Sequence, residues 1–143
     1  GVAGYPEKHF EAPSMEFDLQ RAKEKVDAGA EYIMTQMFFD NKKYFEYVDA
    51  CRAIGINVPI IPGLKPITNK KQLTILPSIF YVDIPADLRN AMQAAETDEA
   101  CEQVGTEWLI QQSKELKAAG VPVLHYYTLG KPKVIKAVAA AIF

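Results

Sequence analysis

The chain alternates between short apolar runs and longer segments in which apolar residues recur at helical spacing. Each run has the length of a strand and ends in a polar or glycine-containing segment, which is typical of buried strands. Because strand-like and helix-like segments alternate along the whole chain, the pattern predicts a parallel sheet with right-handed crossovers. The predicted strands cover residues 2–5, 32–39, 58–64 and 121–128.

Capping signals mark the first three predicted helices. Ser14 can cap the first helix, and Gly29 lies just past its end. Asn41 can cap the second helix. Asn69 and Gln72 have the spacing of a capping box, which predicts a third helix start.

The pattern is less regular after the third helix start. Pro77 and Pro85 bracket a short apolar piece at residues 79–84. Pro132 suits the first turn of a last helix, because its fixed φ is compatible with a helix start. Two further helices are expected between these points, and they cover residues 86–95 and 98–119.

The number of strand–helix units is about half of what a closed barrel needs. A TIM (β/α)8 barrel has eight such units and typically about 250 residues, whereas this chain has 143. Its hydrophobic fraction of 49% is sufficient for a packed core, so disorder is not expected. We therefore expect a single α/β domain over residues 1–143 that corresponds to half of such a barrel.

Charge and composition narrow the class of partner. The net charge is -2, and basic residues are interleaved with acidic ones, which argues against a nucleic-acid surface. No apolar run approaches the ~20 residues of a membrane span. Cys51 and Cys101 lie on apolar helix faces without metal-ligand spacing, so we expect buried thiols, no metal site and a reducing, cytoplasmic location.

A family resemblance rests on several strings that occur in order along the chain. They are GYPEKHFEA at 4–12, DLQRAKEKVDAGA at 18–30, TQMFFD at 35–40, IIPGLKPI at 60–67 and HYYTLGK at 125–131. Together they resemble the methylenetetrahydrofolate reductases over nearly the whole chain. The resemblance implies that the chain corresponds to the C-terminal half of the TIM barrel of such an enzyme.

The resemblance also implies a reaction, cofactors and a flavin site. Such enzymes reduce 5,10-methylenetetrahydrofolate to 5-methyltetrahydrofolate, with FAD as cofactor and NADH or NADPH as co-substrate. The spacing of Asp18, Arg21 and Lys25 places them on one polar helix stripe, although a solvated face is the alternative. His9 could instead be an exposed loop histidine, and Tyr5 could be core packing. The implied flavin-binding residues are Tyr5, His9, Ala12, Asp18, Arg21 and Lys25.

The folate-contacting residues implied by the resemblance are Gln36, Gln72 and Lys131. Gln36 also lies at the end of a predicted strand, where parallel barrels carry their chemistry. Its amide offers both a donor and an acceptor to a heterocycle. The alternative for Gln72 is the capping role. Lys131 falls where many relatives carry Arg, and as a point charge it could attract the glutamate tail of a folate.

No catalytic residue is expected within this chain. The family's glutamic acid and its Arg-Gly-Asp aspartate belong to the first half of the barrel, and this sequence has no such string. We therefore expect the chain to be inactive on its own. We also expect a homo-oligomer, because a half barrel leaves apolar side chains and two strand edges uncovered.

Two other function classes stay open at this point. The chain could be a non-catalytic barrel fragment or binding domain whose ligand surface is incidental. It could also be another α/β-barrel enzyme, such as an aldolase. The aldolase class is disfavoured because no lysine lies inside a predicted strand, where a Schiff base would form.

Overall fold

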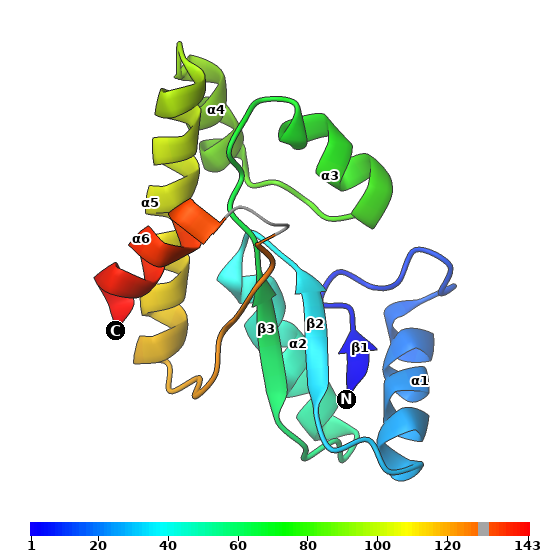
Figure 1. Cartoon of the computed structure of the whole chain (residues 1–143). Helices are drawn as coiled ribbons and strands as arrows, with labels where there is room; N and C mark the ends of the chain where they lie inside the picture. Colours follow the sequence, from blue (N-terminus) through cyan, green and yellow to red (C-terminus); the bar gives the residue numbers. More distant parts are fainter. Residues whose placement is uncertain (129–131) are drawn as a thin grey trace.

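A parallel sheet of strands in the order β1-β2-β3-β4 forms the centre of the computed structural model, which describes residues 1–128 and 132–143 (Figure 1). Each strand pairs in parallel with the next one along the chain, which confirms the predicted α/β class. Strand order follows chain order, as in half of a TIM barrel. The strands are β1 (Val2–Gly4), β2 (Ile33–Met37), β3 (Ile60–Leu64) and β4 (His125–Tyr126).

The helices cover the outer side of the sheet and its carboxyl end. In Figure 1, α2 lies behind β2 and β3, α1 flanks β1, and α5 and α6 lie together at the other side. Helices α3 and α4 lie beyond the carboxyl ends of the strands. The helix bounds are α1 (Met15–Asp27), α2 (Asn41–Ala53), α3 (Gln72–Phe80), α4 (Ala86–Ala94), α5 (Asp98–Ala118) and α6 (Pro132–Ile142).

The first helix has the predicted ends. The Ser14 hydroxyl accepts a hydrogen bond from the Phe17 amide at 3.2 Å, so Ser14 is the N-cap of α1. Gly29 follows the helix with a φ of +107°, a left-handed conformation that glycine adopts without strain. The chain can therefore turn sharply from α1 into β2.

The predicted cap of the second helix is wrong by one residue. Asp40 is the N-cap of α2, and its Oδ1 accepts from the Lys42 amide at 2.9 Å. A carboxylate at this position also interacts favourably with the helix dipole. Asn41 is the first helical residue, and its side-chain amide instead donates to the Gln112 carbonyl of α5 at 3.0 Å.

Two other elements differ from their predicted bounds. Strand β4 contains only His125–Tyr126, and residues 121–124 are irregular; Pro122 in that stretch has no N–H to give to a ladder. Helix α3 continues to Phe80 through Pro77, where a separate apolar piece was expected. Buried Leu73 and Leu76 anchor that helix despite the lost hydrogen bond.

Two apolar clusters hold these elements in place. One lies between the sheet and the outer helices, where Ile33 and Leu64 pack with Tyr44 of α2 and Leu109 of α5. The other lies at the carboxyl end of the strands and includes Met37, Phe39, Leu73, Leu88 and Met92. The second cluster fixes α3 and α4 over the strand ends, which is where parallel barrels bind ligands.

A β-bulge interrupts the pairing of β2 with β3. Met34 pairs with Ile61 and Met37 with Gly63, so β2 advances by one more residue than β3. The fully buried Thr35 fills the gap, because its Oγ1 accepts from the Gly63 amide at 2.9 Å. The Tyr127 hydroxyl donates to the Thr35 carbonyl at 3.0 Å, so one residue of β2 is linked both to β3 and to the residue that follows β4.

Thr35→Val should lower the free energy of unfolding by about 1–3 kcal/mol, because it keeps the side-chain shape but leaves the buried Gly63 amide without an acceptor. Urea denaturation measures this change. Thr35→Ser keeps the hydroxyl and is the matched control, for which we expect the smaller loss. A Ser variant that is less stable than the Val variant would show that methyl packing dominates over the hydrogen bond.

Candidate functional site

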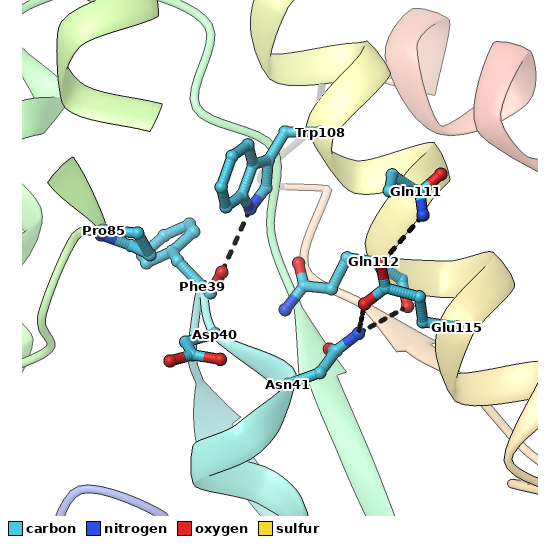
Figure 2. Close-up of a pocket in the computed structure, with 8 residues that line it drawn as sticks. All are labelled: Phe39, Asp40, Asn41, Pro85, Trp108, Gln111, Gln112 and Glu115. Carbon is cyan, nitrogen blue, oxygen red and sulfur yellow. Dashed lines mark hydrogen bonds between the residues drawn. The ribbon is translucent and has the colours of Figure 1, made fainter. Parts of the chain in front are cut away.

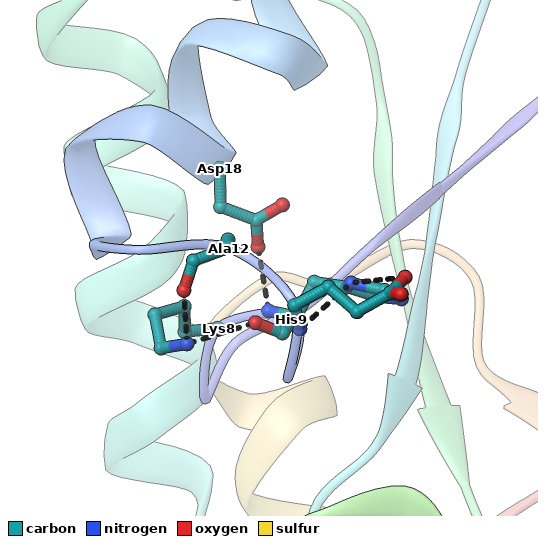
Figure 3. A network of polar contacts seen from close by, with 5 residues as sticks. Lys8, His9, Ala12 and Asp18 are labelled. Carbon is teal, nitrogen blue, oxygen red and sulfur yellow. Dashed lines mark hydrogen bonds and ion pairs between the residues drawn. The ribbon is translucent and has the colours of Figure 1, made fainter.

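Four of the predicted flavin-binding residues gather where β1 ends. The rings of Tyr5 and His9 meet edge-on with centroids 4.6 Å apart. The His9 amide donates to Asp18 Oδ2 of α1 at 2.9 Å, and the Lys8 ammonium donates to the carbonyls of His9 and Ala12 (Figure 3). The structure therefore brings together a strand exit, a loop and the first turns of a helix.

Lys8 determines the shape of this loop. Its φ is +71°, a left-handed conformation that is uncommon for residues other than glycine. The Lys8 amide donates to the Tyr5 carbonyl at 3.0 Å, and the Ala12 amide donates to the His9 carbonyl at 3.0 Å. Two consecutive turns thus direct the carbonyl oxygens of His9 and Ala12 toward the Lys8 ammonium. The hydrogen bonds of this ammonium hold the loop that follows β1 together.

The other two predicted flavin residues lie farther along α1. Arg21 forms an exposed ion pair with Glu24, and its guanidinium lies 5.0 Å from the centre of the Phe17 ring. Lys25 is exposed and has no partner in the part of the chain that the structure describes. At ~1.5 Å per helical residue, Lys25 is about 10 Å along the axis from Asp18. The structure does not bring Lys25 into the cluster at the β1 exit.

An exposed aromatic pair extends that cluster. Phe10 and Tyr81 stack with their centroids 4.7 Å apart and their planes at 9°. They are 52% and 55% exposed. The His9 ring lies 4.9 Å from Phe10. These exposed, flat aromatic rings could pack against a planar ring of a ligand.

The phenols at this end of the sheet are held in their neutral form. Burial raises the pKa of Tyr5, and the nearby Asp18 charge raises it further. Burial also raises the pKa of Tyr127, with a smaller contribution from Tyr5. Both hydroxyls therefore keep their proton at neutral pH, and that of Tyr127 donates to the Thr35 carbonyl.

Gln36 lies in the bulge of β2, next to Thr35. It is half-buried, and its Oε1 accepts from the Met37 amide at 2.9 Å. Its amide nitrogen has no partner among the described residues. The carbonyl half of this amide is thus used to hold the strand end, while the donor half is available to a ligand.

The predicted capping box of Asn69 and Gln72 forms only in part, because the N-cap of α3 is Lys71, which makes no side-chain cap. The Gln72 Oε1 accepts from the Thr68 amide at 2.7 Å, and the Gln72 backbone amide donates to Asn69 Oδ1 at 3.2 Å. Gln72 also lines a cavity of about 960 Å³ at the carboxyl ends of β3 and β4, which Gln36 does not line. The residues around this cavity are Lys65, Pro66, Thr68, Asn69, Gln72, Asp98, Glu99, Glu102, Thr128, Pro132, Lys133, Val134 and Lys136.

Lys131 lies outside the described residues. Thr128 and Pro132, on either side of that segment in the sequence, both line the larger cavity. Lys65, the residue directly after β3, was not among the predicted site residues. Its side chain is only 5% exposed and its ammonium donates to the Pro66 carbonyl at 3.3 Å. A lysine that follows an apolar strand was the signal that could have identified it.

Glu7 was also missed, although it lies within the first quoted string. Its Oε2 accepts from the Asp83 amide at 2.9 Å, which ties the β1 exit to the segment before α4. Burial raises the pKa of Glu7; the Asp83 hydrogen bond and the Lys43 charge oppose that effect without cancelling it. An acidic residue two positions after a buried strand was the available signal.

Two other structural features are absent from the described residues. Within residues 1–128 and 132–143, no group of three or more His, Cys, Asp or Glu side chains is arranged to hold a metal ion. None of the helices in those segments has both the length and the apolar character that crossing a membrane requires.

Comparison with known proteins identifies similar sequences over the whole chain. The model of a family described as methylenetetrahydrofolate reductase matches residues 1–142. Methylenetetrahydrofolate reductase (NADH) 1 of Arabidopsis thaliana is 40% identical in an alignment of 142 positions that covers 92% of this chain and 24% of that protein. The 5,10-methylenetetrahydrofolate reductase of Escherichia coli K12 is 39% identical over 138 residues, 96% of this chain and 47% of that protein.

Solved structures include a similar fold. A Clostridium thermocellum protein, described as binding two copies of 5-methyl-5,6,7,8-tetrahydrofolic acid, aligns with a TM-score of 0.61 and 19% identity. The alignment covers 98% of this chain and 51% of that one. This chain therefore spans about half of the bacterial proteins it matches and a smaller share of the plant one.

The raised pKa of Glu7 predicts a pH-dependent stability difference for Glu7→Gln. A carboxyl whose pKa is raised by folding contributes stability below its unfolded pKa, and loses it as pH rises through the folded value. The Gln variant stays neutral and keeps an acceptor for the Asp83 amide. It should be more stable than the natural chain at pH 7, with the difference shrinking as the pH falls toward about 4.

Thermal unfolding from pH 4 to pH 7 measures this difference, with Glu31→Gln at an exposed position as the matched control. A Glu7→Gln advantage that grows toward acid pH would contradict the direction of the shift.

Proposed function

The chain belongs to the methylenetetrahydrofolate reductase family, and on this premise we propose that it forms parts of the flavin and folate sites of a reductase. The proposed reaction converts 5,10-methylenetetrahydrofolate to 5-methyltetrahydrofolate. The observation that carries the proposal is the gathering of Tyr5, His9 and Asp18 at the carboxyl end of β1, beside an open aromatic surface.

The residues present fit FAD in chemical character. The stacked Phe10 and Tyr81 rings offer a planar ligand an apolar face. Asp18 uses one carboxylate oxygen for the His9 amide and has the other for a ribose or amine donor. Lys25, exposed and without a partner among the described residues, would neutralise a pyrophosphate. Bound flavin would supply the hydride transfer of the reaction.

Arg21 and Ala12 have smaller proposed roles in this cofactor site. Arg21 lies on the same stripe as Lys25 and would add positive charge, although its pairing with Glu24 reduces that effect. The Ala12 carbonyl is already held by the Lys8 ammonium, so Ala12 would act through the fixed backbone of the loop.

The proposed folate contacts are amide donors. Gln36 and Gln72 each use the side-chain carbonyl oxygen for a backbone amide, which leaves the amide nitrogen to donate to an acceptor on the pterin or its linker. Lys131 would attract the glutamate tail. The folate ligand of the Clostridium protein with the same fold is in line with this class of substrate.

We propose a nicotinamide nucleotide as the reductant, because the relatives include proteins named for NADH and, in Caenorhabditis elegans, for NADPH. We assign no catalytic residue to this chain and expect ligand binding without turnover. The buried free thiols of Cys51 and Cys101 suit a reducing compartment, and we propose the cytoplasm.

Separate variants should affect the two proposed sites separately. Gln36→Ala should weaken binding of 5-methyltetrahydrofolate by about tenfold, the effect of one lost hydrogen bond, and leave FAD affinity unchanged. Lys25→Gln should do the reverse. Equilibrium titration of the purified chain, followed by flavin absorbance and calorimetry, measures both affinities.

Lys23→Gln is the matched control for the helix, because Lys23 pairs with Asp27 and has no proposed ligand. A Gln36→Ala variant that loses FAD and retains folate would contradict the assignment. Wild-type chain that binds neither ligand would favour a non-catalytic domain with an incidental surface.

We also propose that the chain forms a homo-oligomer through the inner face of the sheet. The burial of β2 alternates, with Ile33 packed toward the helices and Met34 half-buried on the opposite face. Ile61 of β3 is likewise half-buried on that face. Among the described strands, β1 and β4 each pair on one edge, so apolar surface and strand edges are both available for association.

Ile61→Lys should therefore shift the chain from an oligomer to a monomer at micromolar concentration, because it places a charge on the inner face. Light scattering measures the mass. Ile54→Lys, at an exposed position after α2, is the control and should leave the mass unchanged. A wild-type chain that is monomeric under these conditions would refute the proposal.

A further inference from the structure

A second cavity is lined by none of the proposed flavin and folate residues. Its volume is about 290 Å³, near the lower end of the range for small-molecule sites. It is formed where β2 leads into α2, where the chain enters α4, and along one side of α5 (Figure 2). The lining residues are Phe39, Asp40, Asn41, Pro85, Trp108, Gln111, Gln112 and Glu115.

Two buried amide oxygens in this cavity have no hydrogen-bond partner among the described residues. They are Oδ1 of Asn41, which is 8% exposed, and Oε1 of Gln112, which is 4% exposed. Native proteins satisfy nearly all buried polar atoms, because a buried acceptor without a donor loses its bonds to water. The two oxygens belong to residues that line the cavity but are themselves closed to solvent, so a donor in the cavity reaches them after a small shift of the neighbouring side chains.

The orientation of both amides is fixed by what their nitrogens contact. Gln112 Nε2 donates to the Phe38 carbonyl at 3.0 Å. Asn41 Nδ2 donates to the Gln112 carbonyl at 3.0 Å and to Glu115 Oε2 at 2.8 Å. These three groups can only accept, so turning either amide around would place oxygen against oxygen. The unpartnered atoms are therefore acceptors.

The other lining residues favour a ligand that carries a positive charge on an apolar group. Asp40 and Glu115 are carboxylates, and none of the eight described lining residues is basic. The Trp108 indole donates to the Phe39 carbonyl at 3.0 Å, which fixes the ring as one wall. Figure 2 shows the Gln112 amide between that indole and Asn41. A cation beside a tryptophan face gains further attraction.

We propose that this cavity binds a small organic cation with several N–H donors, of the alkylguanidinium type. Its N–H groups donate to Asn41 Oδ1 and Gln112 Oε1, its charge is balanced by Glu115, and its alkyl part packs on Trp108 and Pro85. The site does not depend on the proposed reductase function. Binding there connects the start of α2 to the middle of α5.

The test uses the intrinsic fluorescence of the purified chain, in which Trp108 is the only tryptophan. Ethylguanidinium and ethylurea are the probes, because they share shape and N–H donors but differ in charge. Ethylguanidinium at low millimolar concentration should give a saturable change. Its affinity should exceed that of ethylurea by about tenfold, since charge-assisted hydrogen bonds are roughly twice as strong as neutral ones.

Glu115→Gln should remove most of this preference, because it neutralises the carboxylate and keeps an oxygen for Asn41. Glu107→Gln, an exposed position on the same helix, should retain the preference. Gln112→Met should weaken both probes together. In each variant, thermal unfolding with and without ethylguanidinium separates loss of binding from loss of folding.

Several outcomes would overturn the proposal. They are equal affinity for the two probes, a fluorescence change that does not saturate, and a preference that survives Glu115→Gln. If Gln112→Met does not fold, the comparison of Glu115→Gln with Glu107→Gln still decides the question.

Discussion

The candidate sites at the ends of β2, β3 and β4 depend on the hydrogen bonds made by Thr35. Its hydroxyl replaces a ladder acceptor for Gly63, and its carbonyl accepts from Tyr127. The approach is so close that a Cβ on Gly63 would lie 2.2 Å from the Thr35 carbonyl oxygen. The bulge in β2 sets the position of Gln36. The chain then leaves the end of β2 and reaches Asp40, the N-cap of α2. The hydroxyl and the carbonyl of one residue thus tie the ends of β2 and β3 to the residue that follows β4.

Local signals were sufficient to predict the order of elements, and they account for one cluster of side chains that the family resemblance pointed to. Ser14 and Gly29 mark the ends of α1 because capping and left-handed turns depend on neighbouring residues only. Tyr5 and His9 come together because both follow the same strand within a few residues. Asp18 joins them because the next helix returns antiparallel to β1. The parallel sheet was predicted from the alternation of strand-like and helix-like segments. Two strands joined through a helix cannot form a tight hairpin, which is the usual connection between antiparallel strands.

Contacts between distant segments could not be predicted in this way. Asn41 looked like a helix cap, yet its amide bonds to Gln112 on a helix far along the chain, and the carboxylate one position earlier makes the cap. Trp108 packs against the second apolar cluster, but its bond to the Phe39 carbonyl, which makes it a cavity wall, has no local signal. Lys65, buried after β3, shares the lining of the larger cavity with residues of α5 and α6 that are distant in the sequence. These features arise only when the outer helices close on the sheet.

The short fourth strand has a consequence for synthesis of the chain. β3 ends at Leu64, and β4 begins only at His125, with two pairs joining them. Closing so long a loop has an entropic cost that two pairs offset only with the help of α5 and α6. At ~5–20 residues per second, a ribosome needs about 3–12 s to make the intervening segment. During that time the edge of β3 in the nascent chain is unpaired. A chaperone or a neighbouring nascent chain can therefore bind this edge before β4 does.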